Sequence, residues 1–455
     1  MFRINKDLCL FSPTGEFFAT AYQQELSIKD SKTLDEYQTF TFTDTIEDFQ
    51  WSPNGQLILC ANSKKNIIEI YSLKLPNWNC KLTEGSAGFE KFTWTPNSKE
   101  FILTSDFNVH LSIYNIHTRK NTQIWGIKSS IKKNYIINNI NEKLAVISSS
   151  DGKDFIEIYE IKNWQLTRKL MCDKLFGIDG VSWSPNGELL AIWCSTIGKS
   201  RLLIYSTITD THIGAFTGEN NEKNNEMHFD DDDEKYVKGI DKIVWGSTGE
   251  LIAIAGYNEK IAIVNYITWS VVLEFYCGPV ITEDNILSKV FKEIDIKPRN
   301  WTNDEFLSTI PDRPLRYKLK EIYERPISLS IDLKPSNYNV SIAAIDILEF
   351  NTSGKYLAMR HQLYPTVMFI WDLMEDTVDY VFTKNPITGI CWKPNSGCLF
   401  IFSNSSVVIE WRPNETAMCF ETPKSIKVLN ASCNPGGDTL ALHGYCKTSI
   451  IRINE

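Results

Sequence analysis

One pattern of nine residues recurs along the chain at nearly regular intervals. It consists of an aromatic or apolar residue, a short turn and an apolar run, and its most similar copies are WSPNGQLIL at 51 and WSPNGELLA at 183. Further copies begin at 11, 94, 137, 245, 350, 392 and 433, and the one at 137 is the most divergent. A period of about 40–45 residues is typical of the four-stranded blades of a β-propeller, so the repeat predicts an all-β fold.

The composition of each copy agrees with a blade. Proline presets φ, and Asn and Gly accept positive φ, so Ser-Pro-Asn-Gly predicts a tight turn between two antiparallel strands. A second alternating stretch follows in every copy, as in IIEIYSL at 67 and VMFIWD at 367. Only Trp371-Asp372 keeps the Trp-Asp dipeptide that gives WD repeats their name. An outer strand is expected next, for example over 163–170.

The nine copies predict a single WD40-type β-propeller over residues 1–455, with eight or nine blades. Seven blades plus an accessory segment is the remaining alternative. The ninth copy ends at Glu455 without an outer strand, and the residues around 2–5 (FRIN) are expected to supply it. Pairing of this N-terminal strand in the last blade would close the ring and leave no open sheet edge.

Two intervals between copies are too long for one blade, which predicts insertions. Residues 217–238 are acidic and rich in Asn, so we expect a disordered loop. A cation site at Asp230–Asp233 beside His228 is an alternative, but a solvated charge run is favoured. Residues 277–344, between the sixth and seventh copies, combine helix-compatible pieces (ITEDNILSKVF) with the strand-like PISLSIDLK at 326–334. A connection this long is usually functional or disordered.

Composition excludes several classes of protein. The net charge of −9 argues against a surface built to hold nucleic acid, and Lys318, Lys320 and Arg325 are too sparse to form a basic patch. No apolar run is long enough for a membrane span or signal peptide, so a cytoplasmic protein without a membrane is expected. The 11 cysteines show no CxxC pair and are expected to be reduced, mostly buried thiols.

The sequence offers no recognisable active site. Phosphate-loop, HExxH and GxSxG motifs are absent, and the six histidines are dispersed. We therefore expect no enzyme activity, no catalytic residue, no cofactor and no metal. His443 near Cys446 is interpreted as core packing, and the repeated tryptophans as core layers. An enzyme with a site in the channel of the propeller is a minor hypothesis, which a bound metal or cofactor there would support.

Candidate partner contacts are found in two places. The segment Glu84, Gly85, Ser86, Ala87 and Gly88 lies between two predicted strands, where glycines either ease a turn or let a partner approach the backbone closely. In the long insertion, Trp301, Tyr317 and Tyr323 either contact a partner or only attach the insertion to the ring.

The run NWNCKLTEGSAGFEKFTWTPNSKEFILTSDFNVHLSIYNI at 77–116 resembles the WDR-eight, or WRAP-seventy-three, family of WD-repeat proteins. IDGVSWSPNGELLAIW at 178–193 and YNEKIAIVNYITWSVVLEF at 257–275 are similar to the same family. The order of repeats and the insertion after the sixth copy also correspond, so the resemblance covers nearly the whole chain. The acidic segment 217–238 departs from the family pattern.

The resemblance implies a non-enzymatic scaffold of the cytoskeleton at the centrosome, centriolar satellite, spindle pole or ciliary basal body. It implies a coiled-coil partner of the synovial-sarcoma-X-breakpoint-interacting (Msd-one) type. Other components of the microtubule-organising centre, such as the γ-tubulin complex or a minus-end kinesin, are further expected partners. Such a scaffold helps anchor microtubule minus ends and assemble spindles or cilia.

An alternative is a translation-associated or RNA-associated propeller of the initiation-factor two-A type, which also has nine WD blades. The acidic balance weighs against this alternative, and co-sedimentation with ribosomes would favour it.

Overall fold

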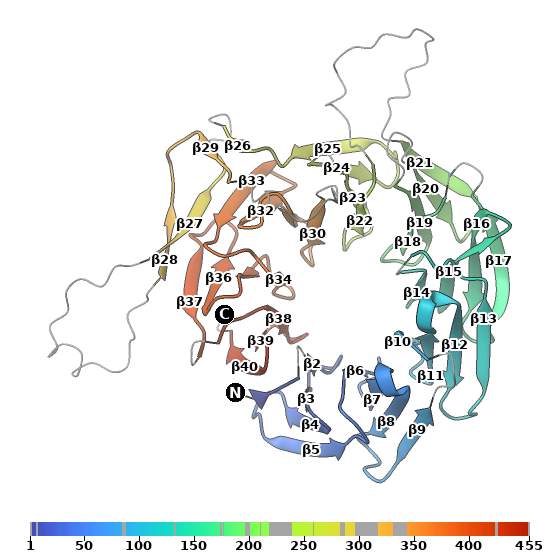
Figure 1. The fold of residues 1–455 in the computed structure, drawn as a ribbon. Coiled ribbons are helices and arrows are strands. Elements are labelled where there is room, and N and C mark those ends of the chain that lie inside the picture. Colours follow the sequence, from blue (N-terminus) through green and yellow to red (C-terminus); the bar gives the residue numbers. More distant parts are fainter. Residues whose placement is uncertain are drawn as a thin grey trace, which may run out of the picture. The chain divides into compact units, whose positions relative to one another are not determined.

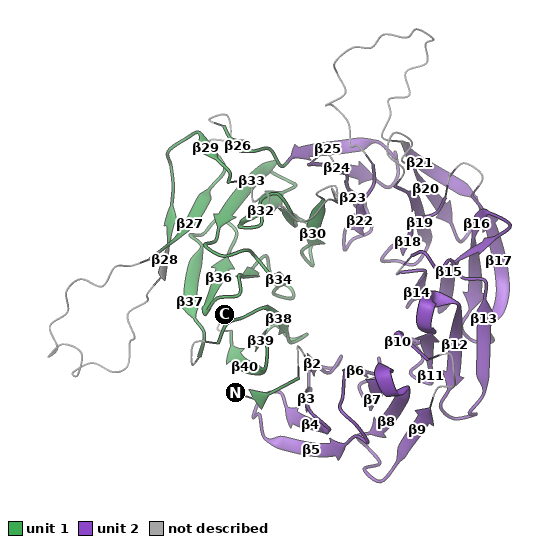
Figure 2. Cartoon of the chain, viewed as in Figure 1, with its two compact units in different colours: residues 1–9, 277–455 green, residues 10–276 purple. Residues whose placement is uncertain are grey.

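The computed structural model divides into two compact units, and each is described by itself (Figure 2). Unit 1 contains residues 1–9 and 277–455, and unit 2 contains residues 10–276. The residues that the structure describes are 2–5, 8–83, 88–131, 133–172, 175, 177–195, 201–209, 211–217, 239–257, 259–282, 287–295, 317–330, 344–423 and 426–453. The predicted acidic insertion therefore lies outside the described residues, except for Thr217 at its start.

Unit 2 carries six antiparallel four-stranded sheets, in which the strands follow chain order (Figure 1). Blades 1 to 3 are β2 Cys9–Phe11, β3 Phe17–Tyr22, β4 Glu25–Asp30, β5 Glu36–Thr41; β6 Asp48–Trp51, β7 Leu57–Asn62, β8 Ile67–Ser72, β9 Asn79–Thr83; and β10 Lys91–Trp94, β11 Glu100–Thr104, β12 His110–Asn115, β13 Asn121–Trp125. Blades 4 to 6 are β14 Tyr135–Asn138, β15 Lys143–Ser150, β16 Lys153–Glu160, β17 Gln165–Met171; β18 Gly180–Trp183, β19 Leu189–Cys194, β20 Arg201–Ser206, β21 His212–Thr217; and β22 Lys242–Trp245, β23 Leu251–Ala255, β24 Lys260–Asn265, β25 Val271–Tyr276. Cys9, at the start of β2, is counted with unit 1.

Unit 1 carries the other three blades and the described part of the long insertion. Blades 7 to 9 are β30 Ile345–Phe350, β31 Tyr356–His361, β32 Val367–Asp372, β33 Thr377–Phe382; β34 Gly389–Trp392, β35 Leu399–Phe402, β36 Val407–Trp411, β37 Met418–Glu421; and β38 Asn430–Cys433, β39 Thr439–His443, β40 Lys447–Arg452 with β1 Phe2–Arg3. The prediction of an all-β propeller is confirmed, and the number of blades is nine.

The chain ends meet in the last blade, as the sequence predicts. Strand β1 runs antiparallel to β40, with Phe2 opposite Thr448, and the sheet order is β1-β40-β39-β38. A second contact joins the same segments, because Cys9 Sγ lies 2.5 Å from His443 Nδ1. Pairing of β1 removes an edge that β40 would otherwise expose.

The repeated turn has a direct physical explanation. In blade 2 the Gly55 N–H donates to the Ser52 carbonyl at 2.8 Å, and Gly55 has φ +68°, which suits glycine. The Ser52 hydroxyl accepts from the Leu57 N–H and donates to the Asn54 side chain. Ser184 forms the same bonds in blade 5. The Ser-Pro-Asn-Gly sequence therefore satisfies its own backbone groups while it joins the first two strands of a blade.

The aromatic residue before the turn links neighbouring blades. Four of the repeat tryptophans donate an indole N–H, each at 3.3 Å, to a carbonyl in the first strand of the preceding blade; the pairs are Trp51 to Leu10, Trp94 to Gln50, Trp183 to Ile136 and Trp392 to Glu349. Trp51, Trp94, Trp183 and Trp245 are buried and Trp392 is half-buried. The interpretation of these tryptophans as core residues is confirmed.

The insertion before blade 7 extends that blade. Strand β27 Val290–Asp295 pairs in parallel with β33, and β28 Tyr317–Glu321 pairs antiparallel with β27, so the sheet has six strands. A two-stranded sheet, β26 Val280–Ile281 with β29 Ile327–Ser328, lies in the same insertion. The stretch ITEDNILSKVF is helix-compatible in sequence, but β26 and β27 occupy its two ends. A strand within 326–334 is confirmed only at β29.

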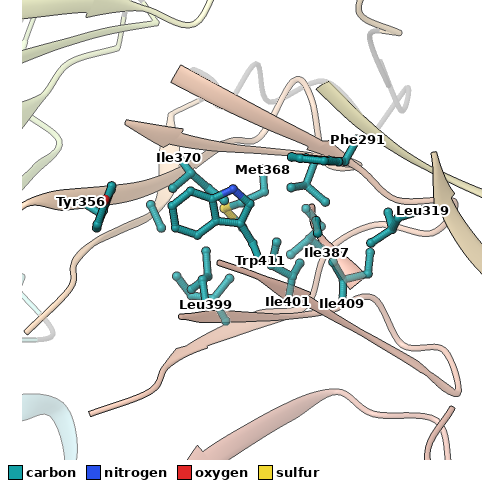
Figure 3. Close-up of a cluster of buried hydrophobic side chains, with 14 residues drawn as sticks. Phe291, Leu319, Tyr356, Met368, Ile370, Ile387, Leu399, Ile401, Ile409 and Trp411 are labelled. Carbon is teal, nitrogen blue, oxygen red and sulfur yellow. The ribbon is translucent and has the colours of Figure 1, made fainter. Parts of the chain in front are cut away.

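The extension is part of the core of unit 1. Phe291 of β27 and Leu319 of β28 are buried in one cluster with Trp411 of β36 (Figure 3). Asp379 of β33 reinforces the cluster: its carboxylate accepts the Lys289 N–H at 2.9 Å and the Trp411 indole N–H at 3.0 Å. Burial raises the pKa of Asp379, and these two hydrogen bonds oppose the rise.

Candidate partner-binding surface

The end of blade 3 between β11 and β12 carries an unusual turn. Phe107 has φ +61° and ψ +15°, and Asn108 has φ +51°. A bulky residue in this left-handed region is an outlier, because its Cβ crowds the backbone. Ser105 fixes the turn, since its hydroxyl accepts the N–H groups of Val109 at 3.1 Å and His110 at 3.0 Å.

The side chains around this turn are apolar and exposed. Phe107 is 86% exposed, Trp125 59% and Val109 49%. Trp125 of β13 lies opposite His110 in the strand register and stacks on its ring, with 4.4 Å between ring centroids. We call Phe107, Val109 and Trp125 the Phe107 surface. Strained backbone at an exposed aromatic residue is a recognised mark of functional sites.

The predicted glycine segment ends next to this surface. Glu84, Gly85, Ser86 and Ala87 lie outside the described residues, and Gly88 is described. Gly88 has φ +60°, and a Cβ at this position would lie 2.4 Å from Asp106 Oδ2 and 3.2 Å from Asn66 Oδ1. Gly88 is therefore packed against the turn that holds Phe107 and against the corresponding turn of blade 2.

The other candidate partner contacts are the aromatic residues of the insertion before blade 7. Trp301 lies outside the described residues, and so does the side chain of Tyr317, which begins β28. Tyr323 is 78% exposed, and a hydrogen bond to Glu321 raises the pKa of its hydroxyl. Phe291 and Leu319 pack the described part of the insertion into the core of unit 1. The two roles considered for Trp301, Tyr317 and Tyr323 stay predictions.

Sequence reasoning missed the Phe107 surface. The signal was present in TSDFNVH at 104–110, where an aromatic residue stands between two polar residues that favour turns. The nearby EGSAG segment drew attention because of its glycines. The exposure of Trp125 could not be predicted from β13, because a tryptophan in a strand is usually buried on one face.

Most cysteines and His443 lie in the core, where they pack against other side chains. None of the eleven cysteines, all among the described residues, is paired in a disulfide, and six are buried. Burial raises the pKa of Cys391 and of Cys398 to about 12, so both remain protonated. His443 is buried, bonds to Cys9 and lies 2.9 Å from the Ser432 hydroxyl, and burial lowers its pKa to about 4. It forms no pair with the exposed Cys446, in agreement with the interpretation as core packing.

One shallow hollow, in blade 4, lies beside β16 and β17. Its volume is about 190 Å³, which is below the range of roughly 300–1,000 Å³ usual for small-molecule sites. Its polar lining is already engaged, because Asp154 binds Lys128 at 2.6 Å and accepts the Ile178 N–H at 3.0 Å. No group of three or more metal-ligating side chains gathers among the described residues. Nor do those residues form a helix that is long and apolar enough to cross a membrane.

Comparisons with known proteins find similarity to WD-repeat proteins. It is 28% identical to the mouse (Mus musculus) WD repeat-containing protein WRAP73 over 451 residues, which cover 97% of this chain and 92% of that protein. The chain has a WD40-type propeller fold and is similar to WRAP73 over nearly its whole length. An uncharacterized WD repeat-containing protein of Schizosaccharomyces pombe is 19% identical over 93% of this chain and 83% of its own length. No protein-family model matches the sequence.

Solved structures support the fold. The C-terminal WD40 domain of Sif2 matches with a TM-score of 0.52 and 10% identity, over 100% of this chain and 97% of that one. A eukaryotic initiation factor matches with a TM-score of 0.56 and 12% identity, over 93% of this chain and 90% of that one. At such low identity the likeness concerns the WD40 fold alone and carries no statement about translation.

Proposed function

We propose that this protein is a non-enzymatic WD-repeat scaffold at the centrosome, centriolar satellite, spindle pole or ciliary basal body. In this proposal it binds a coiled-coil protein of the synovial-sarcoma-X-breakpoint-interacting type and helps anchor microtubule minus ends. The observation that carries the proposal is the similarity to WRAP73 over 97% of the chain. The propeller supports it as well, because blades with short turns present rigid surfaces to partners.

The Phe107 surface is the proposed docking site for the coiled-coil partner. A helix binds a partner through apolar side chains at i, i+3, i+4 and i+7, which need an apolar surface opposite them. Binding energy concentrates on a few aromatic residues, and Phe107 and Trp125 are large, exposed and held by strands or a bonded turn. Gly88 widens access beside the turn because it has no side chain.

The test combines imaging with partner capture. A tagged wild-type protein should form a focus at the centrosome or basal body and should capture the coiled-coil partner. Replacing Phe107 by Asn and Trp125 by Ser should weaken capture by about tenfold or more, as expected for central aromatic contacts. The matched control replaces Ile208 and Ile267 by Asn, because both are exposed in other blades of unit 2 at 68% and 69%.

The outcomes of these experiments distinguish the proposed scaffold role from the proposed docking at the Phe107 surface. A diffuse wild-type protein that captures no coiled-coil partner contradicts the proposed role. Co-sedimentation of that protein with ribosomes would favour the translation alternative. A wild-type focus that survives the Phe107 and Trp125 changes leaves the role standing and excludes this surface.

A further inference from the structure

The hairpin β27–β28 of unit 1 presents two lysines side by side. Lys292 and Lys320 are directly opposite each other in the antiparallel register, and both are exposed. Their neighbours in the two strands, Phe291, Glu293 and Leu319, are buried on the other face. Neither lysine forms an ion pair with any described residue. Side chains opposite each other in such a pair have Cβ atoms about 4.5–5.5 Å apart, and like charges there are destabilising.

More positive charge lies at the same end of the hairpin. Arg325 donates to three backbone carbonyls, those of Ser288, Ile322 and Glu324, and its Nε is buried without a partner. Among the described residues no carboxylate pairs with this guanidinium. The sequence made Lys320 and Arg325 look isolated, but the fold adds Lys292 opposite Lys320.

Three carboxylates lie near the two lysines in the described part of the hairpin, and two of them already have hydrogen-bond partners. Glu293 is 5% exposed and accepts the Lys384 N–H at 3.0 Å. Glu321 is hydrogen-bonded to the Tyr323 hydroxyl. Glu324 is the exposed carboxylate of this end of the hairpin. The exposed face thus carries an excess of positive charge in a chain whose net charge is −9.

We propose that Lys292 and Lys320, with Arg325 at the same end of the hairpin, form a docking site for an acidic, extended segment of a partner protein. Charge complementarity selects the occupant: carboxylates on alternate residues of an extended chain are about 6.6 Å apart and face one way. Such a row can neutralise the paired lysines. Neutralisation by a ligand also removes the cross-strand repulsion that the free hairpin carries.

The test uses the full chain and a fluorescent peptide of about twelve residues with alternating Glu and Val, against a control peptide with Gln in place of Glu. The Glu peptide should bind, and raising the salt from about 50 to 200 mM should weaken binding, because screening reduces attraction between exposed charges. Lys320→Glu should weaken binding by about tenfold or more. The matched control Lys120→Glu changes an exposed lysine of unit 2 and should leave the affinity within about twofold.

Stability provides a second readout, because Lys320→Glu replaces a repulsive pair with an attractive one. Its melting temperature should equal or exceed that of the wild type although peptide binding is lost. The proposal is overturned by a wild type that does not bind the Glu peptide, by equal binding of the Gln peptide, or by equal effects of Lys320→Glu and Lys120→Glu. Tighter binding of a single-stranded oligonucleotide than of the Glu peptide would overturn it in favour of nucleic acid.

Discussion

Phe107 in blade 3 and Phe291 in the extension of blade 7 are the same residue type with opposite environments. Phe291 is 1% exposed and fills a core shared with Trp411, whereas Phe107 is 86% exposed on a left-handed turn. Burial makes Phe291 a source of stability. Exposure and strain mean that Phe107 contributes little to stability, which leaves its ring available for contact with a partner. The comparison separates residues that hold the blades from residues that are available to a partner.

The largest effect is expected from removing Phe291. Phe291→Ala should lower the free energy of unfolding by about 3–5 kcal/mol. The substitution loses the transfer free energy of the buried ring and leaves a cavity in the core. Chemical denaturation measures the change. Phe107→Ala is the matched control and should change stability by less than about 0.5 kcal/mol, as for other surface substitutions. Equal losses for the two variants would contradict the distinction.

Two buried histidines of unit 1 should make stability depend on pH. Burial lowers the pKa of His361 and of His443, both in unit 1, to about 4. The unfolded chain therefore binds more protons than the folded chain between about pH 6.5 and 4, and stability should fall as the pH falls through this window. The loss is at most about 3 kcal/mol for each histidine.

His443→Gln should reduce this slope, because Gln keeps a hydrogen-bonding side chain that does not titrate. Denaturation of both proteins from pH 8 to pH 4 measures the effect, and the difference at pH 8 serves as the baseline. Stability curves that stay parallel for wild type and variant would rule out a contribution of His443.

Gly88 tests how tightly the glycine segment is held against the Phe107 turn. Gly88→Ala introduces a side chain at φ +60° and 2.4 Å from Asp106 Oδ2. Gly152→Ala is the control, because φ is +73° there and nothing lies within 4 Å of the new Cβ. Both variants should lose about 1 kcal/mol from backbone strain, and Gly88→Ala should lose more from crowding. Adding Asp106→Ala should remove only the excess.

The smallest effect concerns the strain at Phe107 itself. Phe107→Asn should raise the free energy of unfolding by about 0.5–1 kcal/mol, because Asn tolerates the left-handed region better than Phe. Phe107→Val, with a branched Cβ that is worse in this region, should have the opposite sign. Thermal unfolding of the two variants decides the point, and a loss of stability in Phe107→Asn would show that the ring makes stabilising contacts.

Much of the fold could be predicted from short-range patterns. The repeated turns, the alternating strands and the aromatic or apolar residue before each turn give the nine blades. In the most similar copies, those of Ser52 and Ser184, the turn satisfies its own backbone groups through a serine hydroxyl and a positive-φ glycine. The pairing of residues 2–5 (FRIN) in the last blade could also be predicted, because the ninth copy ends without an outer strand of its own. The Phe107 surface was not predicted, because the exposure of one phenylalanine or tryptophan depends on which strands surround it.

By itself the sequence determined an all-β chain of repeated blades and the likeness to WRAP73-type proteins. Only the tertiary structure decided what the long insertion does. Strand β27 pairs in parallel with β33, so Val290 meets Tyr380, and residues 90 positions apart, such as Lys289 and Asp379, bond to each other. The antiparallel pairing of β27 with β28 places Lys292 opposite Lys320. A sequence pattern records the period of a strand but not its partner, so these placements arise only from the pairing of the strands.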